Sequence, residues 1–268
     1  MQHNRTTPLY DAIGTGYDIT RRPDPYIASR LAHHLALHTQ GTYLDMACGT
    51  GNYTTALAMQ GGHWHGLDQS RRMLRTARQK AARLAWCQGN VTALPFPDTT
   101  FSGVLCTLAI HHFAALLPAF TEAYRVLASG RLVIFTSTPE QMRGYWLNAY
   151  FPDAMAKSMV QMPTFEGVQA ALIGAGFWLV YTEPYEVRPD LQDFFLYSGK
   201  YRPAMYLSEA VRQGISTFAA LADAAEVRAG CARLQADIAA GRIAEVMQAY
   251  THTAGDYLFV VATKGASG

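Results

Sequence analysis

The sequence is poor in charged residues and in cysteines, and each scarcity excludes a class of protein. Only 16% of the 268 residues are charged, whereas 50% are hydrophobic. Disordered chains have the opposite composition, so an ordered core is expected. The four cysteines (Cys48, Cys87, Cys106 and Cys231) are scattered and form no CxxC pair. We therefore expect neither a disulfide scaffold nor a structural zinc site, and we expect a reducing, cytoplasmic location.

An excess of one charge sign and a long uninterrupted apolar run are also missing. The 22 Lys and Arg residues face 20 Asp and Glu residues, which leaves a net charge of +2 and no reason to expect nucleic acid as a partner. The N-terminal residues contain no apolar core of a secretory signal. The longest apolar stretch, Phe101–Phe120, contains His111, His112 and Pro118, which do not suit a membrane span. We therefore expect no membrane partner.

Short apolar runs alternate with amphipathic segments through the first half of the chain. Strands are predicted at 41–46, 62–68, 84–88, 101–109 and 131–136, and helices at 49–59, 70–84 and 116–127. This alternation predicts an α/β fold in which a doubly wound, mostly parallel sheet carries helices on both faces. The length is close to what one hydrophobic core serves, so a single domain over 1–268 is predicted.

The second half is richer in aromatic residues and then becomes mostly helical before a last strand at 255–264. We interpret this material as insertions around the same sheet, not as a second domain. The predicted core comprises about residues 10–138, 165–187 and 254–264. The predicted cap insertions are about residues 139–164 and 188–253. Because the cap either covers a site or forms a dimer face, a monomer and a homodimer are both compatible with the sequence.

The segment TYLDMACGTGNYT combines a strand end, a glycine-rich turn and a helix start. Glycines at such a turn let the backbone approach a ligand, and Asp68 at the end of the next strand is placed to bind a ribose. These features predict a nucleoside cofactor. Thr54 replaces the third glycine of dinucleotide sites, and Asp45 would repel a diphosphate. A nicotinamide oxidoreductase is therefore disfavoured, and a cofactor with an ammonium and a sulfonium group is favoured.

Several segments together resemble the class I S-adenosylmethionine-dependent methyltransferases. They are LDMACGTG, GLDQS, QGNVTALPFPDTTFSGVLCTLAIHHF, EAYRVLASGRLVI, AGF and GDYLFVVATK. The resemblance covers roughly residues 10–177 and the last strand. It implies a Rossmann-like sheet with an antiparallel last strand, and S-adenosyl-L-methionine as cofactor with S-adenosyl-L-homocysteine as product. It indicates a small-molecule enzyme and leaves the substrate open.

The resemblance also implies a set of cofactor-binding residues. Asp68 would bind the ribose, Asn90 and Val91 would face the adenine, and an arginine of the Arg21–Arg22 pair would bind the cofactor carboxylate. The full set is Tyr17, Arg22, Asp45, Ala47, Cys48, Gly49, Gly51, Asn52, Asp68, Gln69, Met73, Asn90, Val91, Thr107 and His112. For the N-terminal residues the alternative is a surface turn at Pro23–Pro25.

Two residues depart from the pattern of the family. Ala47 replaces the first glycine of the loop, which we expect to be tolerated if its φ stays negative. Asn90 replaces an aspartate, although its amide oxygen still accepts a hydrogen bond. The segment FSGV also lacks the acid that usually follows Phe101.

Two groups of residues are candidates for the chemistry. His111 and His112 follow the fourth strand, where one would act as a base or, alternatively, cap the next helix. The second group is a predicted substrate-binding set. Its aromatic side chains suit an aromatic or hydrophobic metabolite, and Lys200 or Arg202 would bind an anionic group of that metabolite. The set comprises Tyr10, Trp146, Tyr150, Phe195, Tyr197, Lys200 and Arg202. The alternative for this set is a cap core with solvated charges.

Other histidines and the basic run carry less information. His63 with His65, and His33, His34 and His38, lack the further ligands of a metal site, so no metal is predicted. The run Arg71–Arg83 is typical of a solvated helix face. The leading hypothesis is a small-molecule methyltransferase. An RNA methyltransferase and a catalytically inactive cofactor-binding module remain the alternatives.

Overall fold

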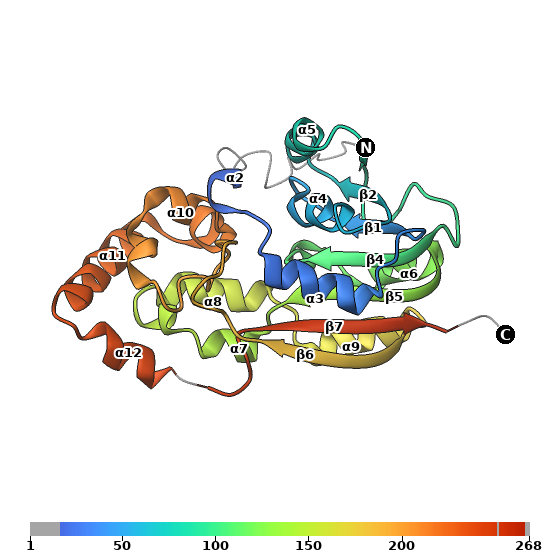
Figure 1. Cartoon of the computed structure of the whole chain (residues 1–268). Coiled ribbons are helices and arrows are strands. Elements are labelled where there is room, and N and C mark those ends of the chain that lie inside the picture. Colours follow the sequence, from blue (N-terminus) through green and yellow to red (C-terminus); the bar gives the residue numbers. More distant parts are fainter. Residues whose placement is uncertain (1–16, 251, 266–268) are drawn as a thin grey trace, which may run out of the picture.

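The computed structural model describes residues 17–250 and 252–265, which form one seven-stranded sheet with helices around it (Figure 1). The strands are β1 (Thr42–Met46), β2 (His63–Asp68), β3 (Ala85–Gln88), β4 (Phe101–Thr107), β5 (Leu127–Thr136), β6 (Trp178–Tyr185) and β7 (Tyr257–Lys264). Their order in the sheet is β3-β2-β1-β4-β5-β7-β6. β7 pairs antiparallel with both neighbours, and the other pairs are parallel. The predicted fold class is confirmed.

Alternating side chains of the strands supply two hydrophobic clusters, one on each face of the sheet. In β1, Tyr43 belongs to one cluster, whereas Leu44 and Met46 belong to the other, as the two-residue period of a strand requires. The first cluster includes residues of α3 (Pro25–Leu35) and α4 (Asn52–Ala58). The second includes residues of α6 (Leu116–Val126) and α9 (Phe165–Gly174). α5 (Arg71–Lys80) packs against β2 and β3.

The helices begin where the sequence supplies capping side chains. Asp24 accepts from the backbone N–H groups of Tyr26 and Ile27 at the start of α3, with Pro25 at the first helical position. Ser70 caps α5 in the same way. α4 begins at Asn52 instead of the predicted residue 49, because Gly49 and Gly51 have positive φ and cannot extend a helix.

Two insertions form the cap. The first, between β5 and α9, holds α7 (Pro139–Arg143), η2 (Trp146–Ala149) and α8 (Pro152–Gln161). The second, between β6 and β7, holds η3 (Pro203–Leu207), α10 (Glu209–Gln213), η4 (Thr217–Leu221), α11 (Ala224–Ala239) and α12 (Ile243–Ala249). In Figure 1 these helices gather on the left, beyond the carboxyl ends of the parallel strands. Ligands of open parallel sheets bind at that edge, so the cap is placed to enclose a site.

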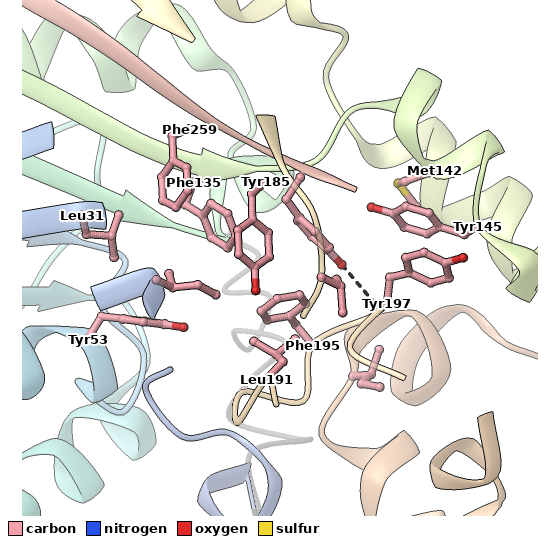
Figure 2. Close-up of a cluster of buried hydrophobic side chains, with 14 of the residues drawn as sticks. Leu31, Tyr53, Phe135, Met142, Tyr145, Tyr185, Leu191, Phe195, Tyr197 and Phe259 are labelled. Carbon is pink, nitrogen blue, oxygen red and sulfur yellow. Dashed lines mark hydrogen bonds between the residues drawn. The ribbon is translucent and has the colours of Figure 1, made fainter. Parts of the chain in front are cut away.

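The cap and the sheet share one aromatic core. Tyr145 and Tyr197 stack with ring centroids 3.9 Å apart, and Phe195 lies between them and the sheet residues Phe135 and Phe259 (Figure 2). All five side chains are buried. Aromatic contacts of this kind carry large buried areas, so we expect the cap to unfold together with the sheet.

Two further observations concern the described residues as a whole. None of the helices within 17–250 and 252–265 combines the length and the apolar character that crossing a membrane requires. In the same part of the chain, no three His, Cys, Asp or Glu side chains gather in a way that would hold a metal ion.

Candidate active site

A cavity of about 260 Å³ lies where the strand order reverses, at the carboxyl ends of β1 and β4. The chain continues from β1 to β2 at one edge of β1, whereas β4 pairs with the other edge. The loops that follow β1 and β4 therefore diverge, which leaves a crevice between them. Most of the predicted cofactor-binding residues line this cavity. They are Asp45, Ala47, Cys48, Gly49, Asn52, Asp68, Gln69, Met73, Asn90, Val91, Thr107 and His112.

The loop between β1 and α4 is held in a left-handed conformation. Gly49 and Gly51 have φ values of 57° and 72°. Ala47 has φ 58°, so the condition of a negative φ, under which alanine was expected to be tolerated here, is not met. The turn requires this conformation because the next N–H, of Cys48, donates to the Leu67 carbonyl at 3.0 Å. An alanine in that region costs about 1–2 kcal/mol, which the rest of the loop offsets.

Gly51 and Gly49 provide a matched pair of alanine substitutions. A Cβ on Gly51 would lie 2.2 Å from the Trp86 ring, whereas a Cβ on Gly49 meets no atom within 4 Å. We expect Gly49→Ala to lower the free energy of unfolding by about 1 kcal/mol through backbone strain alone. We expect Gly51→Ala to lower it by about 3 kcal/mol or more, because overpacking adds to the strain. Equal losses in urea unfolding would contradict the predicted clash.

Backbone hydrogen bonds fix the carboxylate of Asp68 at the end of β2. Its Oδ2 accepts from the N–H of Gly49 and its Oδ1 from the N–H of Ser70, both at 2.8 Å. Each oxygen has a second lone pair. Because Asp68 also lines the cavity, its oxygens are placed to accept from two vicinal hydroxyl groups of a ligand.

Asp45 is a buried carboxyl group at the end of β1. One oxygen accepts from the Thr54 hydroxyl at 2.5 Å, and the other, Oδ1, has no hydrogen-bond partner among the described residues. Burial raises the pKa of Asp45 to about 7, and nearby Asp68 adds to the rise. Across the crevice, the buried Thr107 hydroxyl is also without a partner in the described part of the chain. Buried polar atoms without partners are rare, and here both residues line the cavity.

Two neighbouring histidines follow β4. Their ring centroids lie 3.9 Å apart. Burial lowers the pKa of His112 to about 4, and burial together with His112 and Arg21 holds the pKa of His111 well below its usual range. Both rings are therefore neutral at pH 7. His112 lines the cavity, whereas His111 is not among its lining residues.

The N-terminal segment contributes Arg21 to the cavity wall. Arg21 lines the cavity, whereas Arg22 is exposed, so the choice of Arg22 from the pair is corrected to Arg21. Asp18 accepts from the Thr50 hydroxyl at 2.6 Å and from Lys80 at 3.0 Å, which fastens this segment to the glycine loop and to α5. The side chain of Tyr17, and Tyr10 as a whole, lie outside the described residues.

The structure places the predicted substrate-binding side chains in the cap core and not in the cavity wall. Trp146, Tyr150, Phe195 and Tyr197 are at most 3% exposed and pack in the aromatic core. Lys200 pairs with the buried carboxylate of Asp256 at 2.8 Å, and Arg202 donates to the carbonyls of Leu191 and Ser198. The cap thus uses the four aromatic side chains for its own packing, whereas Lys200 and Arg202 are bonded within the cap and are not the solvated charges of the alternative interpretation. Gly51 also lies outside the wall, against Trp86.

Several residues that line the cavity were not predicted from the sequence, among them Tyr53 and Asp193. Tyr53 belongs to α4 and Asp193 to the cap, and the Tyr53 hydroxyl donates to Asp193 at 3.2 Å. Tyr53 follows the glycine loop directly, which is a signal for a wall residue. Asp193 carries no such signal, because only the tertiary structure brings the second insertion to this edge.

Comparison with known proteins agrees with this geometry. Residues 44–135 match a family described as "Methyltransferase domain". A solved structure from Anabaena variabilis ATCC 29413, whose description assigns it to the methyltransferases and to an antibiotic biosynthesis pathway, is 30% identical. It superposes with a TM-score of 0.82 over 91% of this chain and 99% of that one.

Curated relatives match over a shorter span. A "Demethylmenaquinone methyltransferase" of Lactiplantibacillus plantarum is 36% identical over 149 residues, which are 50% of this chain and 63% of the relative. A "2-phytyl-1,4-naphtoquinone methyltransferase" of Thermosynechococcus vestitus is 29% identical over 160 residues, 54% of this chain and 70% of the relative. The chain thus spans less than two thirds of the first of these relatives. The full-length match to the solved structure, together with a glycine loop and an acidic strand end at one crevice, shows that the chain belongs to the class I S-adenosylmethionine-dependent methyltransferases.

Proposed function

We propose that the cavity binds S-adenosyl-L-methionine and that the protein methylates a small hydrophobic or aromatic metabolite. The observation that carries the proposal is the buried carboxyl of Asp45, whose Oδ1 has no partner among the described residues although it belongs to the cavity wall. A cationic group is the natural partner for such an atom. The cofactor carries an ammonium and a sulfonium group, so the residues present fit it.

Several wall residues would hold the cofactor in this proposal. Asp68 would accept from the ribose hydroxyls, Asn90 and Val91 would lie against the adenine, and Arg21 would bind the carboxylate. When bound, S-adenosylmethionine would supply an electrophilic methyl group: the acceptor bonds in line to the methyl carbon as the C–S bond breaks, and the sulfur leaves as the thioether of S-adenosylhomocysteine. The protein then has to hold the acceptor close and exclude water, which the cap is placed to do. His112 accepts a proton where the acceptor must lose one.

The acceptor class rests on the cavity wall and on the relatives. Beyond His112 the wall continues with Leu108, Phe113 and Ala114, which are apolar or small. The curated relatives named above act, by their names, on quinones, one of which carries a phytyl group. Both observations favour a hydrophobic ring as acceptor. An RNA acceptor is disfavoured by the net charge of +2. The four cysteines are all unpaired, which supports a cytoplasmic location.

Calorimetric titration with S-adenosylmethionine and S-adenosylhomocysteine tests the proposal. We expect both to bind with dissociation constants in the micromolar range, about −8 kcal/mol. Saturating ligand should also raise the melting temperature, whereas NAD should not. If neither ligand binds, Ala47 and Asn90 have disabled the site and the proposal is wrong. If both bind but a metabolite panel yields no methyl transfer, the inactive cofactor-binding module becomes the better description.

Replacing His112 separates chemistry from cofactor binding. We expect His112→Ala to lower kcat by about a hundredfold for an acceptor that loses a proton, with S-adenosylhomocysteine affinity changed less than about threefold. Because the pKa of His112 is about 4, the wild-type rate should not fall from protonation of this ring between pH 8 and pH 6. His111→Ala is the comparison, since His111 is not among the residues that line the cavity. Normal turnover in both variants would place the base elsewhere or show that none is needed.

A further inference from the structure

Asp193 brings three separate segments together at the cap end of the cavity. It belongs to the second cap insertion, is 2% exposed and lines the cavity. Its Oδ1 accepts from Nε of Arg21 at 2.5 Å. Its Oδ2 accepts from Nη2 of Arg21 at 3.3 Å and from the Tyr53 hydroxyl at 3.2 Å. A carboxylate held from three sides in this way is fixed in position and in orientation.

The charge of the cavity wall follows from a short inventory. Among the described lining residues, Arg21 is the cationic side chain, and Asp45, Asp68 and Asp193 are carboxyl groups. Asp193 already neutralises Arg21 through the ion pair. The carboxylate of the cofactor, which the proposed function assigns to Arg21, adds a second anion to the same cation. No positive charge of the described wall is then left for an acceptor.

Three basic side chains of the cap and of α5 are bonded to other groups. Lys200 pairs with Asp256, and Lys80 pairs with Asp18 at 3.0 Å. Arg202 donates to backbone carbonyls of the cap. When S-adenosylhomocysteine is bound, which lacks the sulfonium charge, an anionic acceptor entering beside His112 would thus be repelled by a wall whose described residues carry three carboxyl groups and one guanidinium group. Because the cavity is enclosed by protein, water screens this repulsion poorly.

We propose that Asp193 is a specificity-determining residue that restricts the acceptor to uncharged molecules. The inference rests on the proposed function, since it assumes that the acceptor occupies the cap end of the cofactor cavity. Because the cofactor carboxylate already neutralises Arg21 in the proposed complex, the charge of Asp193 adds an excess negative charge to the wall, which disfavours carboxylates. Specificity of this kind comes from an element that repels the wrong ligand. The proposed acceptor is then a hydrophobic metabolite that carries no charge.

Two probes of matched shape test the inference by calorimetry at pH 7, in the presence of saturating S-adenosylhomocysteine. 1-Naphthol is neutral and 1-naphthoate is anionic. We expect the unmodified protein to bind 1-naphthol at least about tenfold more tightly than 1-naphthoate. In Asp193→Asn the amide oxygen still accepts a hydrogen bond but the negative charge of residue 193 is gone, while the cofactor carboxylate stays on Arg21. The preference should therefore fall below about twofold.

Control variants separate charge from folding. Asp193→Glu keeps the charge and should keep the preference. Asp237→Asn removes a carboxylate elsewhere in the cap, where it bonds to Tyr150 and Arg242, and should leave the ratio unchanged. Equal affinities for the two probes in the unmodified protein, or failure of both to bind, would overturn the inference alone. An unchanged ratio in a folded Asp193→Asn protein would do the same. Failure to bind S-adenosylhomocysteine in the same titration would instead overturn the proposed function, and this inference with it.

Discussion

Asp68→Ala is expected to weaken S-adenosylhomocysteine binding by about a hundredfold or more. Two ribose hydroxyls lose a charged acceptor, and hydrogen bonds to charged groups are worth about 1.5–3 kcal/mol each. The N–H groups of Gly49 and Ser70 lose the same partner, so the loop that lies against the ligand loosens as well. Calorimetry gives the affinity, and unchanged binding would remove Asp68 from the ribose role.

A ligand lacking one hydroxyl separates the two contributions. The 2′-deoxy analogue of S-adenosylhomocysteine should bind the unmodified protein more weakly, and it should lose less than the parent ligand on going to Asp68→Ala. The difference between the two losses measures the direct bond between Asp68 and the 2′-hydroxyl, because the loop contribution is common to both ligands. Equal losses would show that Asp68 acts only through the loop. Asp98→Ala, an exposed carboxylate bound to Arg125, is the control for surface charge.

The parts of the site that could be predicted from sequence are those carried by consecutive residues. The turn from Asp45 to Asn52 joins a strand to a helix, so its glycines, its acid and its place at the sheet edge are all encoded within one short segment. Asp68 follows from the same logic one strand later. The alternation of strands and helices then fixes which edge carries both, because parallel strands end on the same side.

The cap could not be assigned in the same way. Its aromatic residues have the composition of a binding pocket, yet Tyr145, Tyr197 and Phe195 serve as core against Phe135 and Phe259. Composition does not distinguish a binding pocket from a packed core, since both are apolar. Asp193 shows the converse: an acid with no recognisable motif around it becomes a wall residue only because Arg21 and Tyr53, distant in sequence, contact it. The positive φ of Ala47 was likewise set by the backbone bond of Cys48 to β2 and not by local preference.

Asp45→Asn should remove a pH dependence of cofactor binding. A carboxyl with a pKa of about 7 must lose its proton to bind a cationic group well. The affinity of the unmodified protein for S-adenosylmethionine should therefore rise by up to about tenfold per pH unit below 7 and level off above 8. The variant should bind about a hundredfold more weakly at pH 8, with this dependence absent. Taking the ratio of the two affinities at each pH cancels the ionisation of the ligand itself, and a ratio constant from pH 5.5 to 8.5 would contradict the assignment.

The same substitution should make the ligand-free protein more stable at neutral and alkaline pH. Folding raises the pKa of Asp45 from 3.8 to about 7, so its contribution to stability is fully present below pH 4 and is lost as the pH rises through 7. Asparagine carries no charge to desolvate and still accepts from Thr54. Urea unfolding at pH 8 should thus show Asp45→Asn more stable by roughly 2 kcal/mol, with no gain at pH 4. We expect the variant to be more stable without ligand and to bind S-adenosylmethionine less tightly. That combination would show that the Asp45 carboxylate favours cofactor binding at the expense of stability, because the cofactor provides a partner for an oxygen that no described residue bonds.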